Sequence, residues 1–171
     1  MKNNFSQNQR IAILIDVQNL YHSAKHLYHG RVNYGELIKY LRQGRQLIRT
    51  IAYVVKSDTS LGESQFFEAL LKEGIELRMK DLQVYPDGTK KADWDIGMAV
   101  DAMRLSKSVD AIILVTGDGD FLPLVDYLKW GQGTIVEIAA FSKTTSTKLQ
   151  ESADKFINLE DIPRIIIKKW V

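Results

Sequence analysis

Aspartate side chains follow two apolar segments that lie far apart in the sequence. Asp16 comes directly after residues 11–15, and two further acids, Asp118 and Asp120, come shortly after residues 111–115. Short, unbroken apolar runs rich in β-branched residues are typical of strands buried on both faces of a parallel sheet. Open α/β sheets bind ligands at the edge formed by the carboxyl ends of such strands. The sequence therefore predicts that these carboxylates gather at one edge of a sheet.

Carboxylates that share one crevice repel each other, and they stay ionised together only beside a positive charge. Mg²⁺ or Mn²⁺ provides that charge, because hard cations prefer carboxylate oxygens as ligands. The chain has no cysteine, which excludes disulfides, thiolate metal sites and thiol catalysis. We therefore expect a site for Mg²⁺ or Mn²⁺, and we interpret His22, His26 and His29 as surface residues rather than zinc ligands.

The same residues have structural alternatives. Asp93, Asp95 and Asp120 each stand where a helix is expected to begin, and acids there cap the backbone or interact with the helix dipole. We interpret Asp95 as structural in this sense. Asn19 follows Asp16 by about one helical turn, so its amide would fix Asp16, contact a substrate phosphate or cap a helix.

Expected strands and helices alternate along the chain. Apolar runs predict strands at residues 11–15, 48–55, 75–79, 111–115, 134–140 and 156–159. Helical stripes and capping residues predict helices between them, with Asn33 and Ser60 as two of the caps. This alternation predicts a doubly wound, mostly parallel sheet in a three-layer α/β/α fold. In the strand order 3-2-1-4-5, residues 11–15 and 111–115 are neighbours, and a crevice opens at their carboxyl ends.

The composition predicts a single globular domain. The 171 residues are 45% hydrophobic and 26% charged, with a net charge of +2, which is too small for a polycationic nucleic-acid binder. We expect residues 1–10 to be a disordered segment, 11–160 to form the domain, and 161–171 to be a tail whose residues 165–167 pack on the body. The apolar runs are strand-sized, so we expect a cytoplasmic protein that does not span a membrane.

Four sequence blocks carry a resemblance to a known family. They are Ile-Asp-Val-Gln-Asn-Leu-Tyr at 15–21, Lys-Ala-Asp-Trp-Asp at 91–95 followed by Asp101, Val-Thr-Gly-Asp-Gly-Asp-Phe at 115–121, and Ser-x-x-Leu-x-x-x-Ala-Asp-x-Phe at 146–156. In this order they resemble the NYN domain, specifically the LabA-like branch of the PIN-like nuclease superfamily, over roughly residues 10–159. Val17 departs from the glycine that many members have there, and Thr116 replaces the usual serine.

The resemblance implies a Rossmann-like, PIN-like fold and a metal-dependent ribonuclease that hydrolyses RNA phosphodiester bonds. Carried over by position, it implies that the catalytic and metal-binding acids are Asp16, Asp93, Asp118 and Asp120. It also implies that Asn19 and Thr116 are the polar partners at the substrate-binding site. From residue type alone, we expect Lys91 to contact a phosphate, although a solvated turn is the alternative, and Tyr21 to stack on a base of single-stranded RNA.

Two other functions compete with hydrolysis. A non-catalytic regulatory module on the same fold would bind RNA or a protein partner, with salt-dependent RNA affinity and no turnover. A phosphate-binding, receiver-like switch also needs clustered acids, but it requires a lysine at the end of a late strand. Residues 134–140 are followed by Phe-Ser instead, so we rank the switch third. The PIN-like resemblance also makes a homodimer an expectation.

Overall fold

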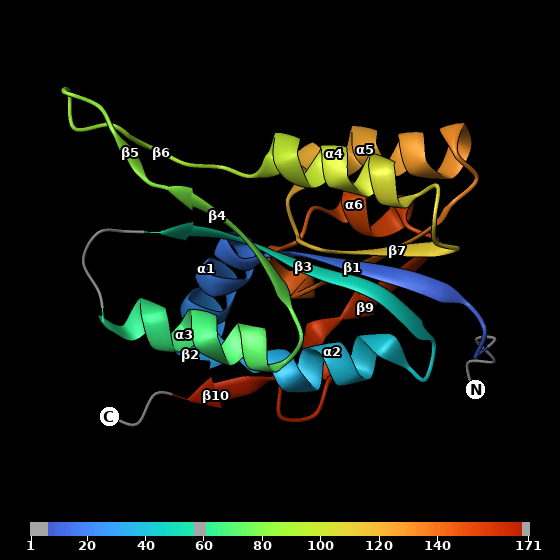
Figure 1. Cartoon of the computed structure of the whole chain (residues 1–171), viewed down its shortest axis with the longest axis horizontal. Helices are drawn as coiled ribbons and strands as arrows, with labels where there is room; N and C mark the ends of the chain where they lie inside the picture. Colours follow the sequence, from blue (N-terminus) through green and yellow to red (C-terminus); the bar gives the residue numbers. More distant parts are fainter. Residues whose placement is uncertain (1–6, 57–60, 169–171) are drawn as a thin grey trace.

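The computed structural model describes residues 7–56 and 61–168 and contains a six-stranded parallel sheet (Figure 1). The strand order is β4-β3-β1-β7-β8-β9, and every neighbouring pair is parallel. The bounds are β1 Arg10–Asp16, β3 Gln46–Lys56, β4 Glu76–Asp81, β7 Ala111–Val115, β8 Ile135–Ala140 and β9 Lys155–Asn158. The predicted doubly wound sheet is confirmed, and its winding reverses between β1 and β7.

Helices cover both faces of this sheet (Figure 1). One face packs against α1 (Val17–Tyr28), α2 (Tyr34–Arg42) and α3 (Leu61–Lys72), and the other packs against α4 (Asp95–Leu105), α5 (Leu122–Asp126) and α6 (Thr147–Ser152). The two layers form separate hydrophobic cores on the two faces of the sheet. The three-layer α/β/α architecture expected from the sequence is therefore confirmed.

Strand β1 shows why its sequence lacks polar residues. Ile11, Ile13 and Ile15 pack in the core beneath α1 and α2, while Ala12 and Leu14 pack in the core beneath α4 and α5. Successive side chains of a strand point to opposite faces, so a central strand covered on both sides must be apolar throughout. The alternation places Asp16 on the side of Leu14, where α4 begins.

Two small sheets lie outside the main one. The strands β2 (Gly30–Val32) and β10 (Ile166–Lys168) pair in antiparallel fashion, which fixes the C-terminal tail to the body as expected. The strands β5 (Gln83–Val84) and β6 (Lys90–Lys91) form a hairpin that projects beyond the sheet (Figure 1). None of the helices within the described residues is long and apolar enough to span a membrane.

Several shorter elements refine the predicted boundaries. The helical segment between β7 and β8 is divided into the 3₁₀ turn η1 (Gly119–Phe121), α5, and the π-helical turn η2 (Tyr127–Gly131). Two further 3₁₀ turns are η3 (Ser142–Thr144) and η4 (Leu159–Asp161). The predicted cap Asn33 is confirmed, since its side chain accepts a hydrogen bond from the Glu36 N–H at 3.2 Å. The predicted cap Ser60 lies outside the described residues.

Residues 1–10 were expected to be disordered, and this expectation is wrong for the last of them. Arg10 is the first residue of β1, and its guanidinium forms an ion pair with Asp110 at 2.7 Å. The preceding Gln9 accepts hydrogen bonds from Gln46 N–H and from the Arg45 side chain. A polar composition suggested a solvated segment, but Gln9 and Arg10 form hydrogen bonds at the amino-terminal end of the central strand β1. Residues 1–6 lie outside the described part of the chain.

Candidate functional site

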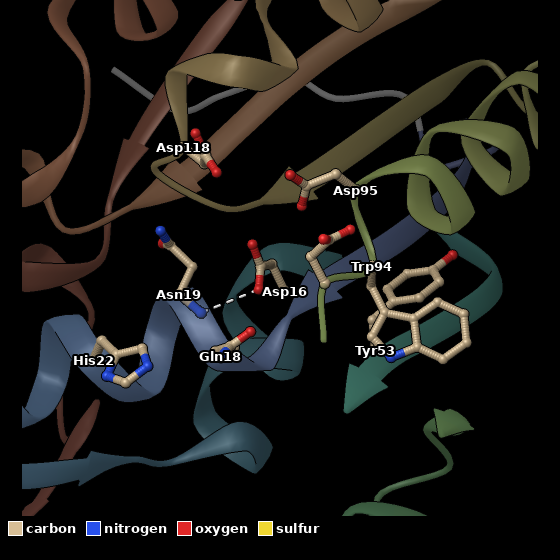
Figure 2. Close-up of a pocket in the computed structure, with 9 residues that line it drawn as sticks. Asp16, Gln18, Asn19, His22, Tyr53, Trp94, Asp95 and Asp118 are labelled. Carbon is tan, nitrogen blue, oxygen red and sulfur yellow. Dashed lines mark hydrogen bonds between the residues drawn. The ribbon is translucent and has the colours of Figure 1, made fainter. Parts of the chain in front are cut away.

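An acidic pocket lies at the carboxyl ends of β1 and β7, where α4 begins (Figure 2). Its volume is about 220 Å³. Side chains from four segments line it, namely Asp16, Gln18, Asn19, His22, Tyr53, Asp93, Trp94, Asp95 and Asp118. Segments separated by about a hundred positions in the sequence meet here because β1 and β7 are adjacent strands in parallel register, with Ile15 paired to Val115. The predicted convergence of acids at this edge is therefore observed.

Asp16 is held by hydrogen bonds to both of its oxygens. Oδ1 accepts the Asn19 N–H at 3.0 Å and thereby caps α1, and Oδ2 accepts the Thr116 hydroxyl at 3.1 Å. Burial raises the pKa of Asp16, whereas these two hydrogen bonds lower it and the charge of Asp118 raises it further. Asp16 is therefore both the cap of a helix and a fixed, half-buried carboxylate of the pocket.

The turn after β7 is held against α1 and against the turn after β8. The Gly117 N–H donates to Asn19 Oδ1 at 2.9 Å, and the Asp118 N–H donates to Thr116 Oγ1 at 3.2 Å. A Cβ on Gly117 would lie 2.6 Å from the Thr145 hydroxyl, so only glycine fits. Asn19 thus adopts a positioning role, joining the first helix to the second acidic segment.

Three carboxylates come closest together at the mouth of the site. One oxygen from each of Asp95, Asp118 and Asp120 lies within 4.8 Å of the others. Burial, together with the charges of four neighbouring acids, Asp118, Asp16, Asp93 and Asp120, raises the pKa of Asp95 to about 6. Such mutual repulsion is relieved by a cation, and a set made only of carboxylate oxygens fits a hard divalent ion.

Trp94 anchors the start of α4 to the sheet, between two of the acids. Its indole N–H donates to the Val54 carbonyl at 2.8 Å, and its ring packs against Tyr53 with centroids 5.5 Å apart. Figure 2 shows the Trp94 ring turned toward Tyr53 and Asp95 turned toward Asp118. The adjacent Asp93 is exposed at the rim of the pocket. This anchor sets the position from which Asp95 reaches the other carboxylates.

The structure brings some predicted site residues together and separates others. Asp16, Asp93, Asp118 and Asn19 line the acidic pocket, and Asp120 joins its exposed side. Thr116, expected at the substrate-binding site, is fully buried, and its hydroxyl hydrogen-bonds to Asp16 and to the Asp118 backbone. Tyr21 is absent from the residues that line the pocket, and Lys91 lines a neighbouring one.

Two residues that line the pocket differ from their sequence-based interpretation. Asp95 is more than a structural acid at a helix start, because its carboxylate lies among the clustered acids. His22 is exposed, as expected of a surface residue, yet its side chain borders the pocket one turn after Gln18 and Asn19. The sequence spacing of Gln18, Asn19 and His22 could have indicated that His22 borders the pocket, because side chains three and four positions apart on a helix share a face.

Asp101, a further acid of the four sequence blocks, belongs to a structural network. Its carboxylate accepts the Tyr53 hydroxyl at 2.8 Å and pairs with Arg78 at 3.5 Å. Asp101 therefore supports the strands beneath the pocket and does not line it.

Comparisons with known proteins agree with this geometry. A solved structure of a protein of unknown function from Vibrio parahaemolyticus RIMD 2210633 superposes with a TM-score of 0.87 and 30% identity, covering 96% of this chain and 99% of that one. The Low amplitude and bright protein LabA from Synechococcus elongatus is 28% identical over 109 residues, which are 60% of this chain and 58% of that protein. The chain thus matches somewhat more than half of the length of this curated relative.

A family model covers nearly the whole fold described above. The NYN domain matches residues 10–160, from the first residue of β1 to the turn η4 after β9. All the acids of the pocket, and the strands and helices that position them, lie within this range. The resemblance found in the four sequence blocks is confirmed, and the chain belongs to the NYN domain family.

Proposed function

We propose that this protein hydrolyses phosphodiester bonds of RNA with the help of Mg²⁺ or Mn²⁺. The observation that carries the proposal is the meeting of Asp95, Asp118 and Asp120, whose oxygens lie within 4.8 Å of one another. Membership of the NYN domain family supports a role in RNA cleavage or in regulation. The arrangement of acids favours cleavage, because a surface used only to bind RNA has no need to gather negative charges next to phosphates.

The cation would be held by Asp16, Asp95, Asp118 and Asp120, with Asp93 at the rim. These side chains offer only hard oxygen ligands, which suit Mg²⁺ and Mn²⁺. Burial and then the charges of the neighbouring acids raise the pKa of Asp95, so a positive charge placed among these acids would stabilise the site. When bound, a divalent cation neutralises the scissile phosphate and lowers the pKa of a water molecule beside it.

The protein's own residues would then position the reacting groups. The Asn19 N–H and the Thr116 hydroxyl hold Asp16 in one orientation, so its carboxylate needs no rearrangement when substrate arrives. Asp93 is exposed at the pocket rim and would orient the attacking water. A flexible single strand reaches a pocket of about 220 Å³ more readily than a duplex does, so we propose single-stranded RNA as the substrate.

Substituting acids at the site tests the proposal. We expect Asp118→Asn and Asp16→Asn each to lower Mn²⁺-dependent cleavage of a labelled single-stranded RNA by at least about a hundredfold, because each removes a charged ligand from the site. Asp126→Asn is the matched control, since Asp126 is an exposed acid on α5 and does not line the pocket. Circular dichroism and thermal melting check that the variants stay folded.

Three outcomes separate the possible functions. Chelation by EDTA should stop cleavage by the unchanged protein, and Mn²⁺ should restore it. Cleavage that persists in both folded site variants would overturn the proposal. Salt-dependent RNA binding without turnover in either metal would instead assign the protein to the non-catalytic alternative.

A further inference from the structure

A second pocket lies beside the acidic one, at the base of the β5–β6 hairpin. Its volume is about 230 Å³, and the residues that line it are Lys80, Gln83, Tyr85, Lys91, Ala92 and Asp93. Asp93 lines both pockets, so the two adjoin at this residue. A chain molecule bound in the acidic pocket would therefore reach the second pocket at Asp93.

The hairpin that carries this pocket is closed by its own hydrogen bonds. The Tyr85 N–H donates to the Thr89 carbonyl at 2.8 Å, and Asp87 Oδ1 accepts the Thr89 N–H at 2.9 Å. Within the hairpin Gln83 is paired with Lys91, so these two side chains share one face of the ribbon. The pocket is thus formed before any ligand binds.

The charge of the second pocket is opposite to that of the first. Lys80 Nζ donates to the Asp93 carbonyl at 2.7 Å and lies 4.5 Å from the centre of the Trp94 ring, which fixes a cation beside the acidic site. Lys91 is exposed and forms no ion pair within residues 7–56 and 61–168. Tyr85 adds an aromatic ring that is 45% exposed.

We propose that this second pocket binds the nucleotide that flanks the scissile phosphate in a single-stranded nucleic acid. Lys80 and Lys91 contact its phosphate, and the Tyr85 ring stacks on its base. The position relative to the scissile bond rests on the proposed function, whereas the binding of a nucleotide does not. Lysine supplies the charge that a phosphate requires next to a group of carboxylates, and an aromatic ring stacks on any base.

A binding experiment on the full chain tests this subsite. The probe is a short fluorescein-labelled oligouridylate, and its affinity is measured by fluorescence anisotropy in EDTA so that no bond is cleaved. We expect Tyr85→Ala and Lys91→Gln each to weaken binding by about tenfold, as expected for the loss of one stacked base or one phosphate contact. Tyr85→Phe keeps the ring and should bind like the unchanged protein.

Lys90→Gln is the matched control for charge. Lys90 is the neighbour of Lys91 in the same hairpin, but it is paired with Val84 and does not line the pocket. Both substitutions remove one exposed positive charge, so a purely non-specific attraction would be weakened equally by the two. We expect Lys90→Gln to change affinity less than about twofold, and Lys91→Gln to reduce the slope of log affinity against log salt by about one.

The outcomes for binding and cleavage are separable. If Tyr85→Ala and Lys91→Gln bind like the unchanged protein, or weaken binding no more than Lys90→Gln does, the subsite is overturned while cleavage remains testable through Asp118→Asn. Absence of any oligouridylate binding to the unchanged chain also overturns the subsite. Loss of binding in both pocket variants, in a protein that cleaves no RNA, supports the subsite and overturns the nuclease.

Discussion

Thr116 contacts the two acidic segments of the site at once. Its hydroxyl donates to Asp16 Oδ2 and accepts the Asp118 N–H, and the residue is fully buried. A small hydroxyl in this position therefore sets the distance between an acid at the end of β1 and an acid after β7. Groups that orient metal ligands in this way commonly contribute about 10–100-fold to metal affinity.

Replacing this hydroxyl by a methyl group should weaken metal binding without creating a cavity in the core. We expect Thr116→Val to lower Mn²⁺ affinity by about tenfold or more, because valine keeps the shape but removes the hydrogen bond to Asp16 Oδ2. Isothermal titration calorimetry measures the affinity. Thr116→Ser keeps the hydroxyl and should retain affinity, and equal binding by the valine variant would show that Thr116 does not position the acids.

Burial and the charges of four nearby acids oppose the ionisation of Asp95. Its pKa is about 6 in the folded protein, above the usual value for an aspartate, because burial and four acids oppose its ionisation. A raised folded-state pKa favours the folded protein at low pH, and this contribution is lost as pH rises through about 6. The metal-free protein is therefore destabilised by this group at neutral pH.

Removing the charge of Asp95 should stabilise the metal-free protein. We expect Asp95→Asn to raise the melting temperature in EDTA at pH 7.5 by about 2–4 °C, equivalent to about 1 kcal/mol after allowing for solvent screening. The gain should disappear near pH 4, where the unchanged side chain is protonated. Mn²⁺ should raise the melting temperature of the unchanged protein more than that of the variant, and a lower melting temperature for the variant in EDTA would contradict this account.

At the scale of single elements, the turn between β7 and η1 determines where the acids lie. Gly117 contacts the turn after β8 so closely that a Cβ would lie 2.6 Å from Thr145 Oγ1 and 3.3 Å from the Thr144 carbonyl oxygen. The Ser146 N–H also donates to the Gly117 carbonyl at 3.3 Å. The acidic segment is thus packed against backbone, which has little freedom to move.

A methyl group at this turn should displace the acids. We expect Gly117→Ala to destabilise the protein by about 1–3 kcal/mol, as overpacking in a tight site does, and to abolish the Mn²⁺-dependent rise in melting temperature. Urea denaturation measures the free energy of unfolding. Gly62→Ala is the control, because a Cβ on this helical glycine meets no atom within 4 Å and should be neutral or slightly stabilising.

The sequence predicts the strands of this fold better than it predicts the start of one helix. The strands near residues 11–15 and 111–115 are predictable because burial on both faces of the sheet requires an unbroken apolar run. Segments exposed to solvent rarely contain such a run. The local pattern allows a helix start at Asp93 or at Asp95, and the helix begins at Asp95. Trp94 decides this, because its indole bonds to the Val54 carbonyl on a strand forty positions earlier.

The role of Asp95 is hidden from the sequence for the same reason. An acid in the first turn of a helix interacts favourably with the helix dipole wherever the helix lies, so the local pattern cannot distinguish a structural acid from a metal ligand. Only the neighbouring strands reveal which carboxylates it meets. The β2–β10 pair cannot be predicted from the sequence for another reason. Strands of three residues are too short to show a periodic pattern.

At the scale of the whole molecule, one buried ion pair joins the two halves of the sheet. Arg45 precedes β3, and its guanidinium donates to both oxygens of Glu137 on β8, at 2.6 and 3.1 Å. Both side chains are almost completely buried. Because β1 and β7 lie between these strands in the sheet, the pair links segments on opposite sides of the acidic site.

Breaking this pair should destabilise the protein as a whole. We expect Glu137→Gln to cost about 3–5 kcal/mol, because it removes the carboxylate charge that faces the buried Arg45 guanidinium. Urea denaturation followed by circular dichroism measures the loss. The variant should still bind Mn²⁺ below its melting temperature, since neither residue lines the pocket. A loss under about 1 kcal/mol would mean that water or another group compensates the arginine.

The central position of β1 also governs the order in which a newly made chain acquires its site. Ile11 pairs with Ala111, so one of the two edges of β1, which precedes the other strands of the sheet in the sequence, stays uncovered until residues 111–115 have been made. Until then it can pair only with β3, and Asp16 has no companion acids from β7 or α4. A divalent ion bound as proposed would therefore stabilise the molecule only after translation has passed the last aspartate of the cluster, Asp120.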